Sequence, residues 1–160
     1  MKPLISNIVV AVTGTDASVL AAKYAIVMAK NYHCKLTAVY VVDTATIKQL
    51  TLSKIFLQEE GVAYEKNLEN NGDRYLTFVE ELANAKGVKI EKILRRGAIY
   101  TEILSVAEDK KSDLILIGGW EKDTKTKDIF GHSHREIMAN AKCSVLLVKE
   151  PDIDQIYKKT

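Results

Sequence analysis

The chain has 160 residues and a mass of 17.8 kDa, the size of one ordinary domain, and 47% of its residues are hydrophobic, enough to build a core. Its 23 basic and 21 acidic residues give a net charge of +2, too close to balance for a dedicated nucleic-acid-binding surface. With 8 Gly, 2 Pro and 28% charged residues, the composition also excludes a disordered or collagen-like chain.

Short β-branched runs alternate with longer amphipathic segments, a pattern typical of a parallel sheet covered by helices on both faces. The first run is apolar throughout, as expected for a central strand buried on both sides. The sequence therefore predicts a single, doubly wound α/β domain with five strands. In chain order, the predicted elements are a strand at 8–12, a helix at 17–31, a strand at 36–42, a helix around 47–58, a helix at 73–86, a strand at 90–94, a helix at 99–110, a strand at 114–117, a helix at 133–141 and a strand at 145–148.

The end of the chain differs in character from the rest. We therefore divide the chain into a domain at 1–148, which contains the predicted strands, and a tail at 149–160. Pro151 suits the first turn of a helix, and Ile153, Ile156 and Tyr157 fall on one side of such a turn. A frayed terminus and docking on the same or a partner chain both remain open.

Two cysteines, Cys34 and Cys143, form neither a CxxC pair nor a zinc-ligand spacing. We interpret them as reduced thiols beside strands and expect a cytoplasmic protein. No signal-peptide pattern is visible, and apolar runs such as 36–42 are much shorter than the ~20 residues of a membrane span. We therefore expect neither a membrane nor a nucleic acid as partner.

Ligands of open parallel sheets bind beyond the carboxyl ends of the strands, where the strand order reverses. The turns at that edge are 13–16, 43–44, 95–97 and 118–121. Several contain glycine or a hydroxyl residue, and such turns present backbone N–H groups to a phosphate at a helix N-terminus. A nucleotide pocket is therefore physically plausible here.

The stretch from Gly118 onward carries the most specific pattern. A strand ends in glycine, a charged loop at 121–128 returns at Gly131 to open a helix, and a last apolar strand follows. This stretch resembles the universal stress protein family, whose equivalent region reads Gly-x-x-Gly, nine residues, then Gly-Ser or Gly-Thr. Gly118 and Gly131 fit the first and the later glycine. The segments VAVTGTDAS and YVVD and the stretch 97–107 are similar too, in the family's order.

The resemblance implies the strand order 3-2-1-4-5 and, in binding members, a site that wraps the phosphates and ribose of a nucleotide. ATP or AMP is the implied cofactor, with Mg²⁺ in the case of ATP. Val41 matches the position whose backbone meets adenine, and Ser133 and His134 are expected at a helix N-terminus. The candidate binding residues are Thr13, Gly14, Val41, Gly118, Gly119, Gly131, His132, Ser133 and His134.

Three positions depart from the family's pattern. The second glycine is replaced by Glu121, whose negative charge is expected to oppose ATP. The Ser or Thr after the later glycine is His132, and the acidic residue at the end of the first strand is Thr13. Lysines in the charged loop offer charge for a phosphate, although such loops are more often simply solvated.

Other site types fit less well. His132 and His134 lack the further ligands of a metal site, so no metal is expected, although a pH-sensitive contact with an anion stays open. The segment 131–135 lacks the final glycine and the preceding strand of a nucleophile elbow. A flavin site has only Trp120 and Tyr100 as candidate rings. A receiver domain needs an acid where this chain has two arginines.

We interpret the chain as a non-enzymatic stress protein that acts through dimerisation and protein contacts. The alternative is an adenine-nucleotide switch, binding ATP or AMP, with slow or no hydrolysis. The last strand is an exposed apolar edge that pairing with a second copy would cover. The sequence therefore predicts a homodimer through Val145, Leu146, Leu147 and Val148, and its other protein partners are unknown.

Overall fold

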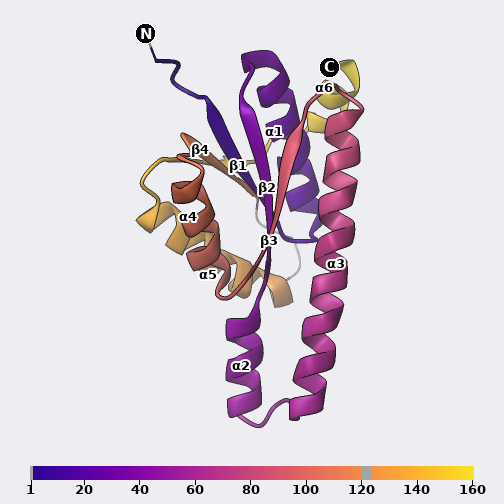
Figure 1. The fold of residues 1–160 in the computed structure, drawn as a ribbon, viewed down its shortest axis with the longest axis vertical. Coiled ribbons are helices and arrows are strands. Elements are labelled where there is room, and N and C mark those ends of the chain that lie inside the picture. Colours follow the sequence, from indigo (N-terminus) through magenta and orange to yellow (C-terminus); the bar gives the residue numbers. More distant parts are fainter. Residues whose placement is uncertain (1, 120–123) are drawn as a thin grey trace.

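The computed structural model describes residues 2–119 and 124–160, and for residues 124–131 it describes the backbone alone (Figure 1). Five strands form one parallel sheet in the order β3-β2-β1-β4-β5, which confirms the predicted doubly wound fold. The strands are β1 (Asn7–Val12), β2 (Lys35–Val42), β3 (Ile90–Arg96), β4 (Leu114–Gly118) and β5 (Ser144–Val148).

Helices cover both faces of the sheet, with α1, α3 and α6 on one side and α4 and α5 on the other (Figure 1). Within residues 2–119 and 124–160, none of them combines the length and the apolar character that crossing a bilayer requires. The helices are α1 (Asp16–Tyr32), α2 (Thr44–Leu52), α3 (Gln58–Asn84), α4 (Ile99–Asp109), α5 (Thr124–Asn140) and α6 (Ile153–Lys159).

The central strand β1 shows why its sequence is apolar without alternation. Successive side chains of a strand point to opposite faces. Ile8 and Val10 pack into the core beneath α1 and α3, whereas Val9 and Ala11 pack into the core beneath α4. All four are buried, because the sheet has a hydrophobic core on each face.

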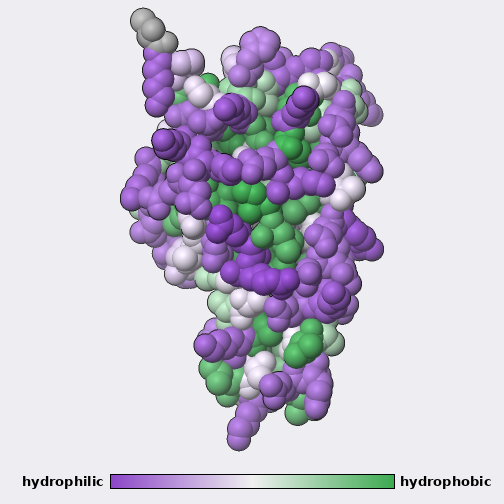
Figure 2. All heavy atoms as spheres, in the orientation of Figure 1, coloured by the Kyte–Doolittle hydropathy of each residue, from purple (hydrophilic) through white to green (hydrophobic). Residues whose placement is uncertain are grey.

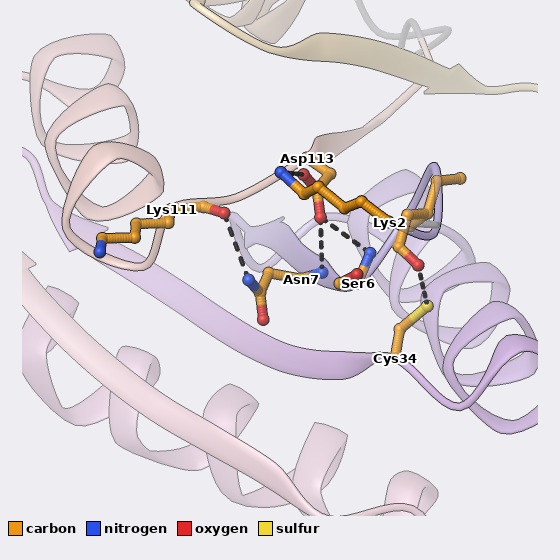
Figure 3. Close-up of polar contacts among 7 residues, drawn as sticks. Lys2, Ser6, Asn7, Cys34, Lys111 and Asp113 are labelled. Carbon is orange, nitrogen blue, oxygen red and sulfur yellow. Dashed lines mark hydrogen bonds and ion pairs between the residues drawn. The ribbon is translucent and has the colours of Figure 1, made fainter.

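At the amino end of the sheet, one carboxylate holds the start of β1 against β4 (Figure 3). Asp113, just before β4, accepts hydrogen bonds from the backbone N–H groups of Ser6 at 2.8 Å and Asn7 at 3.0 Å. These two bonds lower the pKa of Asp113, because they favour its ionised form. Nearby, the Cys34 thiol donates to the Ile5 carbonyl at 3.3 Å. Both cysteines are free thiols.

Two helices differ from the prediction between β2 and β3. The helix expected around 47–58 ends at Leu52, and the next helix begins at Gln58 instead of Asp73. The part of α3 that precedes Asp73 is polar and contains Gly61 and Gly72, so its sequence shows no apolar period. The structure explains both glycines: each lies where the helix axis approaches a neighbouring side chain closely.

The helix after β4 also differs from the prediction. It begins at Thr124 instead of Ser133, so most of the charged loop expected at 121–128 is helical. Polar residues are compatible with a helical backbone, and only a buried apolar stripe would have revealed this helix in the sequence. Trp120 and Glu121 lie outside the described residues.

The C-terminal tail docks on its own chain. It forms α6, in which Ile153 and Tyr157 are buried in the core shared with α1 and α3. The Tyr157 hydroxyl donates to the Leu82 carbonyl at 2.6 Å, and Lys23 of α1 forms an ion pair with Asp154 at 2.6 Å. The docking alternative is therefore the correct one for this segment.

Candidate functional site

Two cavities lie at the carboxyl edge of the sheet. The first, the glycine cavity, has a volume of about 30 Å³ and lies between the ends of β1 and β4 and helices α4 and α5. The second, the hairpin cavity, has a volume of about 330 Å³ and lies between the ends of β1 and β2 and helices α2, α3 and α4. Thr13, Ile99 and Ile103 line both, so the two cavities adjoin.

The glycine cavity collects many of the candidate residues. Although they come from three different segments, five of the nine line it: Thr13, Gly118, Gly119, Ser133 and His134. Val41 lines the hairpin cavity instead. Gly14 and His132 line neither, and Gly131 lies within α5, where only the backbone is described.

The turn after β1 is organised by hydroxyl groups. Thr15 is the N-cap of α1, and its side chain accepts from the Ser18 N–H at 3.1 Å. The Thr13 N–H donates to the Ser18 hydroxyl at 3.1 Å, and the Thr13 and Thr15 hydroxyls lie 3.0 Å apart. These groups already serve the start of α1. The turn therefore offers a phosphate fewer donors than its sequence suggested.

Gly14 has a structural role in this turn. Its φ of +77° lies in the left-handed region, and a Cβ there would lie 3.0 Å from the ring of Tyr75 on α3. Both the backbone conformation and the ring favour glycine. Gly14 thus shapes the turn without lining a cavity.

The glycines after β4 permit close packing of backbone on backbone. A Cβ on Gly118 would lie 2.7 Å from the carbonyl carbon of Ala17 in α1, and one on Gly119 would lie 2.9 Å from the carbonyl oxygen of Val148. Real Cβ atoms do not approach so closely. These glycines are therefore required by the fold as well as suited to approach by a ligand.

The histidines differ from the prediction, because they lie inside α5 and not at a helix N-terminus. The His134 Nε2 donates to the Gly118 carbonyl at 2.6 Å, which links α5 to the end of β4. His132 is exposed and contacts Tyr100 ring edge to face, with centroids 5.8 Å apart. An anion bound at a helix start by Ser133 and His134 is therefore not supported.

The hairpin cavity is lined mainly by residues that the sequence did not reveal as a group. Tyr40 and Val41 contribute from β2, and Leu50, Phe56 and Tyr64 contribute from the α2–α3 hairpin. The rings of Phe56 and Tyr64 meet edge to face at 5.6 Å. Only the path of α2 and α3 brings these side chains beside β2. The nearest signal in the sequence was the pair of glycines in the polar part of α3.

The charge on the cavity lining is low. Asp43 is the only formally charged residue among the described lining residues, and its carboxylate caps α2 by accepting from the Thr46 N–H at 3.0 Å and hydroxyl at 2.7 Å. Burial, with smaller contributions from Tyr64 and Tyr75, raises the pKa of Tyr40, so its phenol stays protonated. The cavity therefore suits an uncharged, largely apolar group.

Two arginines near this edge face other partners. The strand β3 runs on through Arg95 and Arg96, beyond the predicted end at residue 94. Arg96 pairs with Glu65 and Glu69 on α3 at 3.0 and 2.9 Å, while Arg95 pairs with Asp109 on α4 at 3.1 Å. These arginines hold the helices to β3 and do not line either cavity.

Residues 5–149 match the model of the universal stress protein family. Among curated proteins, universal stress protein MJ0531 of Methanocaldococcus jannaschii is 34% identical over 150 residues, which cover 92% of this chain and 84% of the relative.

Solved structures show the same fold. A universal stress protein in complex with cAMP superposes with a TM-score of 0.64 at 21% identity, covering 90% of this chain and 96% of the other. The universal stress protein from Archaeoglobus fulgidus in complex with dAMP superposes with a TM-score of 0.62 at 16% identity, covering 92% of this chain and all of the other.

Proposed function

Because the chain belongs to the universal stress protein family, we propose that it is a non-enzymatic regulatory protein whose ligand is an adenine nucleotide. The observation that carries this proposal is the hairpin cavity, which opens beside Val41 at the carboxyl ends of β1 and β2. Its volume of about 330 Å³ lies within the range of small-molecule sites. Two proteins of the same fold are described in complex with cAMP and dAMP, which supports this ligand class.

The character of the lining supports a separate position for each part of such a ligand. The uncharged base suits the hairpin cavity, where Tyr40 and Val41 offer an apolar wall and no cation is present among the described lining residues. The adjoining glycine cavity lies toward Gly118 and Gly119, on the side where the ribose and phosphates would lie. A nucleotide with few phosphates fits this lining better than ATP, since the Thr13 turn uses its own donors for α1.

The states of the described titratable groups support a protein that binds a ligand without catalysing a reaction. The Asp43 carboxylate is engaged in capping α2, and His134 holds the Gly118 carbonyl. Burial raises the pKa of the Cys34 and Cys143 thiols, which makes them poor nucleophiles at neutral pH. Free thiols suit a reducing compartment, so we place the protein in the cytoplasm.

Calorimetric titration with adenosine, AMP, cAMP and ATP with Mg²⁺ tests this proposal. We expect saturable binding of at least one of them, and a loss of affinity in Val41→Phe, because the larger side chain fills part of the cavity. Ile156→Phe, at an exposed position on α6, is the matched control and should bind like the unmodified protein. Absence of heat with all four ligands at millimolar concentration would refute the proposal.

A second candidate function, association through β5, is favoured by the position of that strand. Among the described strands, β5 pairs only with β4, and Val145, Leu146 and Leu147 are only partly buried. An edge of this kind is a template for pairing with a second copy. We expect a dimer by analytical ultracentrifugation at micromolar concentration, weakened by Val145→Lys with an unchanged circular dichroism spectrum. A monomer under these conditions would contradict it.

A further inference from the structure

The α2–α3 hairpin extends beyond the carboxyl edge of the sheet (Figure 1). The helix α2 and the first turns of α3 run side by side, joined by residues 53–57, and Lys54 in the connection has a φ of +59°. The two helices approach closely at Gly61, where a Cβ would lie 3.0 Å from the Thr51 hydroxyl oxygen. The hairpin is therefore a packed unit of its own.

Large apolar side chains gather on the outside of this unit, where Figure 2 shows hydrophobic residues. Of the ten large hydrophobic residues exposed in the described part of the chain, five belong to the hairpin, with exposed fractions between 46% and 73%. Exposed apolar side chains that gather in one region, unlike single scattered ones, mark interaction sites. We call this group the hydrophobic tip, and it consists of Leu52, Ile55, Leu57, Val62 and Tyr64.

The charges around the hydrophobic tip indicate what kind of partner fits. Lys48 and Lys54 lie on α2 and the connection, and Glu59 and Glu60 lie in the first turn of α3. All four are exposed, and within the described residues none of them forms an ion pair. Two positive and two negative charges cancel, so the tip lacks the positive charge that attracts a nucleic acid or an anionic membrane.

A surface with separate basic and acidic parts is complementary to itself. When two copies meet about a two-fold axis, each residue of one faces a different residue of the other, so lysines can face glutamates twice. The exposed apolar side chains lie at the last residue of α2, in the connection and in the first two turns of α3, so two tips can meet end to end. The exposed apolar side chains and the charge pattern thus favour the same occupant, a second copy of this chain.

We propose that the hydrophobic tip is a homotypic interface, in which the tips of two copies meet about a two-fold axis with Lys48 and Lys54 of one copy opposite Glu59 and Glu60 of the other. This interface is separate from the β5 edge, and it adjoins the hairpin cavity at Tyr64, which belongs to both. A chain with two independent two-fold interfaces forms assemblies larger than a dimer. The expected species is a tetramer or longer array when both interfaces are formed.

Sedimentation velocity over a range of concentrations tests the proposal. We expect the unmodified protein to associate through the tip, and Ile55→Glu combined with Val62→Glu to weaken that association roughly tenfold or more. Phe78→Glu is the matched control, because Phe78 is also exposed on α3 but lies outside the tip. This variant should associate as strongly as the unmodified protein. Equal association of the tip variant and the unmodified protein would overturn the proposal. Val145→Lys removes the contribution of the β5 edge to association, so the two interfaces can be measured separately.

Charge reversal separates self-association from other uses of the tip. Lys54→Glu and Glu59→Lys should each weaken association, and the double variant should restore it, because complementarity between identical copies returns. A double variant as weak as either single variant would overturn the arrangement. Vesicles of neutral and of anionic phospholipid provide a further check: co-sedimentation of a monomeric protein through the tip would assign the surface to lipid and refute the homotypic interface.

Discussion

Replacing Gly72 with alanine tests how closely α3 packs on the sheet. A Cβ at this position would lie 2.6 Å from Tyr40 Cδ1 and 2.8 Å from Leu94 Cδ1. Tyr40 is almost fully buried, so its ring has little room to move away. Overpacking of this kind costs about 1–3 kcal/mol, and contacts below 3 Å place it in the upper half of that range.

The helix propensity of alanine acts in the opposite direction. Alanine stabilises a helix interior by about 0.5–1 kcal/mol relative to glycine. We therefore expect Gly72→Ala to lower the free energy of unfolding by about 1–2 kcal/mol, with a decrease in Tm of roughly 2–4 °C per kcal/mol. Urea denaturation followed by circular dichroism measures this change, and an unchanged m-value shows that the unfolding transition itself is the same.

Gly61→Ala is the matched control on the same helix. There the nearest atoms are Thr51 Oγ1 at 3.0 Å and Ile47 Cγ2 at 3.4 Å, a contact that a small shift relieves. The gain in propensity and the mild crowding nearly cancel, so we expect a change within about 0.5 kcal/mol. If the Gly72→Ala and Gly61→Ala variants had the same free energy of unfolding, α3 would not pack against Tyr40 as closely as the structure shows.

Two further predictions concern polar contacts that join distant parts of the chain. Asp113→Asn should destabilise the fold by about 1–2 kcal/mol at pH 7, because a neutral amide oxygen accepts from the Ser6 and Asn7 N–H groups more weakly than the carboxylate does. The folded pKa of Asp113 is lowered, so its contribution is present above the unfolded pKa and is lost as the pH falls through the folded value. The difference between the unfolding free energies of the two proteins should therefore shrink below about pH 4, and a pH-independent difference would contradict this assignment. Tyr157→Phe should cost about 1–2 kcal/mol in urea denaturation, because the Leu82 carbonyl near the end of α3 loses its hydrogen bond; an unchanged midpoint would mean that this hydrogen bond does not help to hold α6 in place.

Much of the sheet was predictable from local patterns. A strand buried on both faces is apolar almost throughout, and the runs at 8–12, 36–42 and 114–117 became such strands. The apolar run at 145–148 also became a strand, at the edge of the sheet. The rule that ligands bind at the carboxyl ends of parallel strands also placed Thr13, among other residues, at a cavity. These inferences hold because they depend on one segment, or on an edge that all parallel strands share.

The helices that were mispredicted had no such local signal. The first half of α3 and the first half of α5 are polar, and the sequence pattern that identifies a helix is the apolar stripe it buries. The position of Ser133 and His134 depended on where α5 begins, so the expectation that they lie at a helix N-terminus was wrong together with that boundary.

Local patterns were enough to identify the fold class and the edge of the sheet at which the two cavities lie, and the family resemblance supplied the strand order. Each follows from hydrophobic burial along single segments, or from motifs contiguous in the chain. Only the folded arrangement shows that α2 and α3 form a hairpin, that Phe56 and Tyr64 meet Tyr40 and Val41 around one cavity, and which apolar side chains remain exposed. Those facts depend on how segments that are distant in the sequence pack against one another. Close packing at a position such as Gly72 can be seen only when the side chains that surround it are in place.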